Sequence, residues 1–174
     1  LDGNSYPVIT IGNKLWMQKN LAVRRYRNGQ AIDLITDSVT WKKQADFGLG
    51  ARCWYNNDSI SNAGKYGMLY NGFVVNQGIA PEGWHLPEKS EIDELQNWIG
   101  YDGGTLKEAG MTNWSSPNEG ATNTTGFTAL PGGRRIAENV NPNNPQTSFL
   151  EINESGFWWT STMGTGFWYP INPR

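Results

Sequence analysis

Residues 83–99 constrain the fold of this chain more than any other stretch, because a Gly-Trp-His-Leu-Pro motif there leads into a helical pattern. The apolar residues of the pattern recur at helical spacing and form one stripe, made of Ile92, Leu95, Trp98 and Ile99. Pro87 stands at the start, where a missing N–H costs nothing, and Gly100 is well placed to end the helix. We therefore predict one main helix over about 88–99.

The other secondary-structure signals are short. Gly12-Asn13 and Asn28-Gly29 each separate two short apolar runs, which predicts two hairpins. Asp37 and its neighbours are predicted to cap a short helix that ends near Gln44. Extended segments are predicted at 52–55, 126–133, 157–162 and 166–169, and a polar loop at 56–65. These signals predict an α+β fold with short antiparallel strands, one main helix and long polar loops.

Composition limits both the core and the partners. The 174 residues suffice for one domain with a sizeable core. Only 37% are apolar, yet the chain holds 9 Trp, 7 Tyr and 6 Phe, so the core must be built from aromatic rings. A net charge of −2 without a basic stripe argues against nucleic acid as a partner. No apolar run approaches the roughly 18 residues that a transmembrane helix needs, so we expect no transmembrane segment.

Several motifs follow one another in a fixed order along the chain. They occupy residues 2–4, 11–12 and 15–17; 20–21; 54–58, 66–67 and 69–71; 83–87; and 126–133 with 158–162. Taken together, they resemble the Fibrobacter succinogenes major paralogous domain family over nearly the whole chain.

The resemblance implies a secreted or surface-anchored protein, usually a lipoprotein, of the Bacteroidetes–Fibrobacter group. It also implies a fold similar to C-type lectin domains and formylglycine-generating enzymes. We accordingly expect a single domain over 1–174, and we expect that the closing C-terminal strand with which members usually finish is missing. The family's biochemical role is largely undefined, so the resemblance implies a setting rather than an activity.

Catalytic residues are not expected. Formylglycine-generating enzymes depend on a pair of copper-binding cysteines, whereas this chain has Cys53 alone, among apolar neighbours that predict a buried, inert thiol. The only histidine, His85, lies inside the Gly-Trp-His-Leu-Pro motif, and neither a Ser-His-Asp arrangement nor a histidine cluster for zinc can be built without it. The chain is therefore interpreted as a non-enzymatic protein.

Calcium is the one cofactor that the residues leave open, because it takes oxygen ligands from Asp, Asn and backbone carbonyls. Asn56, Asn57 and Asp58 are the candidate ligands. Against this, the Glu-Pro-Asn and Trp-Asn-Asp triplets of C-type lectins are absent, and Asn and Asp also form turns without any metal. We expect no required cofactor.

Candidate binding residues lie in and beside the polar loops. The set is Trp114, Asn118, Glu119, Asn123, Arg134 and Arg135. An exposed Trp114 could stack on a ligand, and an inward-pointing Trp114 could equally anchor its loop. The arginine pair could bind a ligand carboxylate, or one arginine could cover an aromatic ring. Most other tryptophans are expected in the core: Trp16, Trp84, Trp98, Trp158 and Trp159.

The first functional hypothesis is a non-catalytic, cell-surface or secreted binding or accessory domain. It would contact a glycan or a surface protein through loops 113–123 and 138–154. The alternative is a structural subunit of a larger surface assembly with no small ligand, in which an open strand edge accepts a partner strand. An enzyme is the least favoured class, because no nucleophile–base pair is apparent.

Overall fold

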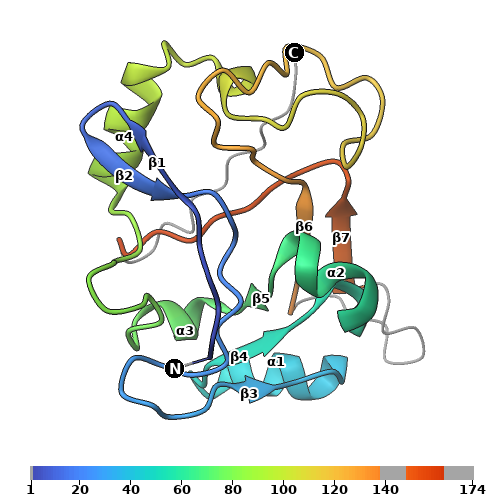
Figure 1. The fold of residues 1–174 in the computed structure, drawn as a ribbon. Coiled ribbons are helices and arrows are strands. Elements are labelled where there is room, and N and C mark those ends of the chain that lie inside the picture. The colour runs from blue at the N-terminus through green and yellow to red at the C-terminus, as the bar shows by residue number, and fades with distance from the viewer. Residues whose placement is uncertain (1, 138–147, 163–174) are drawn as a thin grey trace. The chain divides into compact units, whose positions relative to one another are not determined.

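A computed structural model describes residues 2–137 and 148–162 of the chain (Figure 1). The helices in it are α1 (Ser38–Asp46), η1 (Tyr55–Asn57), α2 (Ser59–Tyr66), α3 (Gly72–Val75), α4 (Lys89–Trp98) and η2 (Gly103–Thr105). The strands are β1 (Val8–Ile11), β2 (Lys14–Met17), β3 (Asp33–Leu34), β4 (Ala51–Cys53), β5 (Leu69–Tyr70), β6 (Gly132–Arg135) and β7 (Phe149–Ile152). Short strands combined with a few helices confirm the predicted α+β class.

Within the described residues the strands form three small sheets, β1-β2, β3-β4-β5 and β6-β7. β1 and β2 are antiparallel, with Ile9 opposite Trp16 and Ile11 opposite Lys14, so the hairpin predicted around Gly12 is confirmed. β4 pairs in parallel with β3 and antiparallel with β5. The expectation of antiparallel strands throughout is therefore wrong for β3 and β4. The chain runs from β3 through α1 to β4, and the two strands pair in parallel.

The described residues form two compact units. The first unit contains residues 2–4, 21–86, 134–137 and 148–150; the second contains 5–20, 87–133 and 151–162. Each unit has its own core and is described by itself below.

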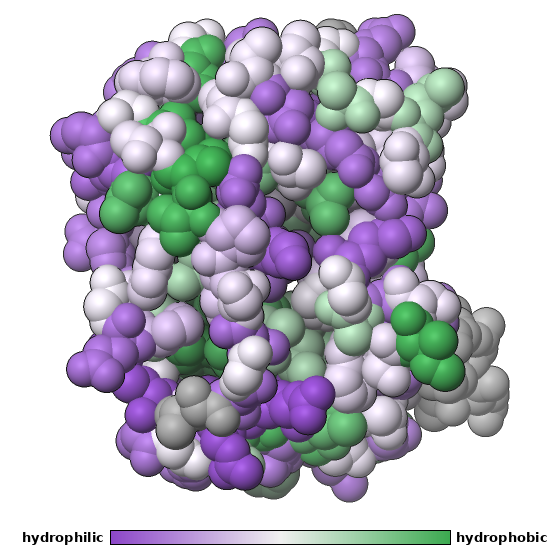
Figure 2. Space-filling model, viewed as in Figure 1, coloured by the Kyte–Doolittle hydropathy of each residue, from purple (hydrophilic) through white to green (hydrophobic). Residues whose placement is uncertain are grey.

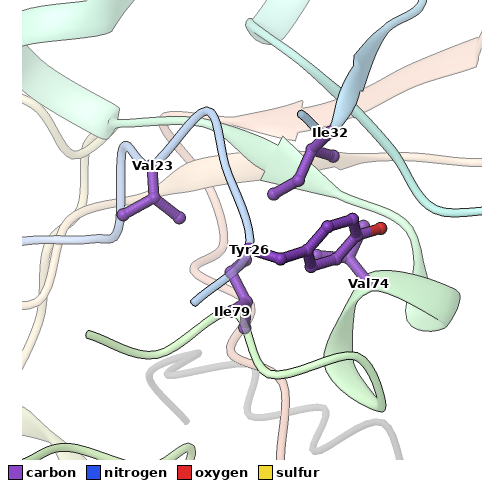
Figure 3. Close-up of a cluster of buried hydrophobic side chains, with 5 residues drawn as sticks. All are labelled: Val23, Tyr26, Ile32, Val74 and Ile79. Carbon is purple, nitrogen blue, oxygen red and sulfur yellow. The ribbon is translucent and has the colours of Figure 1, made fainter. Parts of the chain in front are cut away.

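The core of the first unit is a cluster of Val23, Tyr26, Ile32, Val74 and Ile79, all buried (Figure 3). The Tyr26 ring lies beside Val74 in this cluster. A Cβ on Gly50 would collide with the Tyr26 hydroxyl, so only glycine permits this approach.

The core of the second unit combines aliphatic side chains with aromatic rings. Its buried residues are Ile11, Leu106, Trp114 and Ala129, and partly buried rings pack around them. Phe127 links two of these rings in edge-to-face contacts, at 6.4 Å from Trp16 and 6.3 Å from Trp158 between centroids. The prediction of a core built from aromatic rings is therefore confirmed only in part for this unit, and it is wrong for the buried cluster of the first unit, which is aliphatic apart from Tyr26.

The helix predicted over 88–99 is α4, which belongs to the second unit. Its first turn is closed by the Glu91 carboxylate, which accepts a hydrogen bond from the Glu88 backbone N–H at 3.0 Å. At the other end Gly100 adopts a positive φ of 63° and ends the helix, as its position in the sequence predicts. The α1 prediction is also confirmed, since Asp37 accepts a hydrogen bond from the Thr40 N–H.

Three local predictions need correction. Residues 56–65 are not a loop, because they contain η1 and α2, and Asp58 caps α2 by accepting the N–H groups of Ile60 and Ser61. The strand predicted at 126–133 lies further along the chain, because the strand there is β6 at Gly132–Arg135 and shares only positions 132–133 with the predicted range. Around Asn28-Gly29 the turn forms, but its strands are reduced to one bridge between Arg25 and Ala31.

Residues 157–162 form no strand, although their aromatic sequence is typical of one. Trp158 is held instead through its indole N–H, which donates to the Asn20 side-chain oxygen at 3.0 Å, and through its contact with Phe127. Packing of side chains therefore takes the place of strand pairing there. The strand predicted at 166–169 and residues 138–147 of the loop predicted at 138–154 lie outside the described residues. The described remainder of that predicted loop is not irregular throughout, because it contains β7.

Candidate functional site

A groove of about 640 Å³ lies between the β1–β2 turn and α4 in the second unit. Its apolar floor comes from the side of the hairpin that faces the core, with Ile11 and Trp16, and from Leu95 of α4. Its polar lining consists of Asn13, Lys14, Glu91, Glu94 and Asn97. The groove is open and its lining is about as polar as it is apolar, so a ligand there would meet both kinds of group.

Trp98 forms one side of the groove and is 58% exposed. Its indole lies against the turn at Gly12, where an added Cβ would stand only 3.1 Å from the Trp98 ring. The missing side chain at Gly12 therefore lets the ring lie close to the hairpin. Nearby, the Tyr101 hydroxyl donates to the Asn97 side-chain oxygen at 2.7 Å, which orients that amide.

Lys14 joins the two sides of the groove electrostatically. Its ammonium lies 3.2 Å from a Glu91 carboxylate oxygen and 3.3 Å from one of Glu94. The hydrogen bonds to Glu91 and Glu94 raise the pKa of Lys14 above its usual value. The groove therefore combines one cation and two carboxylates with an exposed indole, which suits hydrogen bonding to a polar ligand that also has an apolar face.

Trp114, which the sequence left as either an exposed or an anchoring ring, is 4% exposed. Its indole N–H donates to the Ala129 carbonyl at 3.1 Å, and the Lys107 ammonium lies 4.4 Å from its ring centroid. Burial lowers the pKa of Lys107. The exposed alternative is therefore wrong for this residue, and the ring anchors its loop.

The other polar candidates of loop 113–123 hold the loop together. The Asn118 amide donates to the carbonyls of Glu108 and Gly110, at 2.9 and 2.6 Å. Asn123 exchanges hydrogen bonds with Thr128 through both its amide atoms. Glu119 is exposed. Most of the polar character that singled out this loop therefore serves turn formation.

Arg134 and Arg135 belong to the first unit, whereas the candidates in loop 113–123 belong to the second. The Arg135 guanidinium stands 4.5 Å from the Trp41 ring centroid and 4.7 Å from that of Phe149. It also donates to the carbonyls at positions 35 and 36. For Arg135 the aromatic-covering alternative is confirmed; Arg134 is partly buried and also takes part in interactions within the fold.

The calcium candidates also have structural tasks. Asn56 and Asn57 both adopt left-handed backbone conformations, at φ 52° and 58°, and the Asn57 amide donates to the Thr36 carbonyl. One carboxylate oxygen of Asp58 accepts the two hydrogen bonds that cap α2. Across residues 2–137 and 148–162, no three His, Cys, Asp or Glu side chains gather as metal ligands would.

Cys53 is buried, as the sequence predicts, and burial raises the pKa of its thiol to about 11. That value keeps the thiol protonated and unreactive near neutral pH. His85 is exposed in the segment that leads to α4. In the part of the chain that the structure describes, no helix is long and apolar enough to cross a membrane.

The groove was not predicted from the sequence, because Trp98 fits the apolar stripe of the helix and was expected in the core. A sharper signal was present, since Glu91, Glu94 and Trp98 follow the spacing i, i+3, i+7 and share one row of the helix. That row flanks the apolar stripe and is mostly charged. Asn13 gave no comparable signal, because it also fits a hairpin turn.

Comparison with known proteins gives one family. The sequence model described as the Fibrobacter succinogenes major domain matches residues 9–167, which is most of the chain. No curated protein and no solved structure gives a match.

Proposed function

The chain belongs to the Fibrobacter succinogenes major domain family, and on this premise we propose that it is a non-catalytic binding or accessory domain, secreted or held at the cell surface. Its ligand in this proposal is a glycan, bound in the groove of the second unit. The observation that carries the proposal is the exposed Trp98 ring beside polar groups from both α4 and the hairpin turn.

The chemistry of the groove supports a sugar more than an apolar ligand. A pyranose ring has an apolar face that can lie on an indole, and a rim of hydroxyls that need hydrogen-bond donors and acceptors. Asn13 and Asn97 offer both kinds of group, and Glu94 offers an acceptor. The groove carries more carboxylates than cations, so the proposed ligand is a neutral sugar rather than an acidic one.

The proposal includes the lectin-like fold and the location outside the cytoplasm that the family resemblance implies. The α+β class supports the fold, as do the short strands joined by long irregular segments. The binding surface differs from the one expected from sequence, because Trp114 and the amides of loop 113–123 are engaged inside the fold.

A glycan array probed with the purified protein, with and without calcium, tests the proposal. We expect binding to neutral glycans that falls at least tenfold, or about 1.4 kcal/mol, in Trp98→Ala, while the unfolding midpoint changes little. Trp159→Ala is the matched control, because it removes another exposed tryptophan that does not line the groove. Loss of binding in EDTA would add calcium to the site.

Equal binding by the wild type and Trp98→Ala would show that the groove is not the site. A blank array with folded protein would contradict the glycan proposal itself.

A second candidate function, the structural subunit of a surface assembly, is favoured by the outward face of the β1–β2 hairpin. Val8 and Leu15 are 42% and 62% exposed there. Figure 2 shows hydrophobic side chains gathered over the part of the molecule where Figure 1 draws β1 and β2. Exposed apolar surface of this kind marks interaction sites. Sedimentation of the same protein separates the candidates, since a monodisperse monomer counts against the assembly.

A further inference from the structure

A second cleft, in the first unit, is lined by arginines. It has a volume of about 390 Å³, and its lining consists of Asp2, Arg24, Arg25, Ala31 and Arg52. No aromatic or large aliphatic side chain lines it, so a ligand there would be recognised through charge and hydrogen bonds.

Two of the guanidinium groups are fixed by the backbone around them. Arg25 donates to the Gly29 carbonyl at 3.2 Å, and Arg52 donates through Nε to the Ile32 carbonyl at 3.0 Å. Because these bonds hold the side chains in place, less conformational entropy is lost when a ligand binds them.

The Arg24 guanidinium is different. Among residues 2–137 and 148–162 no hydrogen bond or ion pair involves it, although its backbone N–H is used. Its five N–H donors are therefore available on an exposed side chain at the cleft.

The chain itself places a carboxylate in this cleft. One oxygen of Asp2 accepts the Arg24 backbone N–H at 2.6 Å, and the other lies 3.9 Å from Arg25 Nε. The Asp2 side chain is only 8% exposed, so this anion is held among the arginines rather than in solvent. It engages neither the Arg24 guanidinium nor the terminal nitrogens of Arg25.

The charges do not balance. Three guanidinium groups and the Asp2 carboxylate line the cleft, and Asp33 is a further negative charge that acts on Arg52. One positive charge remains in excess. Burial lowers the pKa of Arg52, and the nearby Arg24 makes a smaller contribution in the same direction.

We propose that the arginine cleft is a second binding site, which takes the carboxylate of a small acid or of an acidic sugar between the forks of Arg24 and Arg25. The planar guanidinium fork matches a carboxylate with two parallel N–H···O bonds. The cleft volume lies at the lower end of the range for ligand sites, which suits one acidic monosaccharide rather than a longer segment. The site is independent of the groove proposed above.

Calorimetric titration at low salt tests this proposal, with four probes: galacturonate, trigalacturonate, galactose and acetate. We expect galacturonate to bind and galactose not to bind, and we expect trigalacturonate to bind no more tightly than galacturonate, because the cleft holds one sugar. Acetate binding as well as galacturonate would identify any small carboxylate as sufficient, whereas binding of the uronates alone would assign the site to acidic sugars.

Three variants locate the binding. Arg24→Gln should weaken galacturonate at least tenfold, and Asp2→Asn should strengthen it, because it removes the competing negative charge but keeps an acceptor for the Arg24 N–H. Lys43→Gln, at an exposed position of α1, changes the net charge as Arg24→Gln does and should leave binding unchanged.

Two results would overturn the proposal. One is equal weakening by Lys43→Gln and Arg24→Gln, which would mean that only net charge matters. The other is the absence of carboxylate binding in the wild type and in Asp2→Asn. Trp98→Ala should not alter carboxylate binding. A failure of the arginine-cleft proposal can therefore be distinguished from a failure of the glycan proposal.

Discussion

Trp98 and Trp114 lie in the same compact unit and have opposite surroundings. Trp98 ends an amphipathic helix and is 58% exposed, whereas Trp114 stands in a polar loop and is 4% exposed. Their sequence neighbours favour the reverse. The surroundings of a tryptophan ring therefore depend on partners elsewhere in the chain, such as Ala129 and Lys107 for Trp114, and not on the polarity of the adjacent residues.

Truncating Trp114 should have the largest effect. Trp114→Ala removes a buried ring, its hydrogen bond to Ala129 and the cation–π partner of Lys107, so we expect a loss of about 3–5 kcal/mol in unfolding free energy. Trp98→Ala should cost less than about 1 kcal/mol, as for a surface residue. Guanidinium unfolding monitored by far-UV circular dichroism measures both. Equal losses in the two variants would show that the contrast in burial has no energetic meaning.

Gly12→Ala tests the contact that positions the exposed ring. Gly12 has a φ of 63°, and its Cβ would stand 3.1 Å from the Trp98 ring. We expect a loss of about 1–2 kcal/mol from the left-handed backbone, together with a shift of the Trp98 indole NMR resonance. Gly29→Ala is the matched control, since Gly29 also has a positive φ but its Cβ would meet nothing within 4 Å. An unchanged indole resonance in Gly12→Ala would break the link between the turn and Trp98.

Lys14→Met should have the smallest effect. The folded-state pKa of Lys14 is raised by Glu91 and Glu94, so its ion pairs stabilise the fold below the unfolded pKa, and this contribution is lost as the pH rises through the folded pKa. We expect a slightly lower melting temperature for the variant at neutral pH and low salt. The difference should shrink in 1 M NaCl and above the pKa of Lys14. A difference that persists in high salt would mean that packing, not charge, is lost.

Prediction from the sequence succeeded where the signal was local. The α4 and α1 ends, the Gly12 hairpin and the buried Cys53 all follow from one or two residues whose chemistry acts on their neighbours. It failed for α2, whose capping residue Asp58 lies in an asparagine-rich run that also suits a loop. At 157–162 the aromatic residues serve packing, which no strand propensity can distinguish from pairing.

The candidate sites were predictable only in part. Arg135 was recognised as a residue that could cover an aromatic ring, but Trp41 and Phe149 could not be named as the rings, because they are far from it in sequence. The arginine cleft is lined by residues 2, 24–25, 31 and 52, and their spacing in the sequence does not predict that they lie together.

The sequence by itself determined the family, the α+β class and the main helix with its two ends. These depend on periodicity, capping and turn chemistry, which act over a few residues. The tertiary structure alone decided which tryptophan is exposed, which amides are occupied, and where the charged groups Lys14, Asp2 and Arg24 find their neighbours. The reason is that burial and charge pairing depend on contacts between segments distant in sequence, and local patterns carry no record of those contacts.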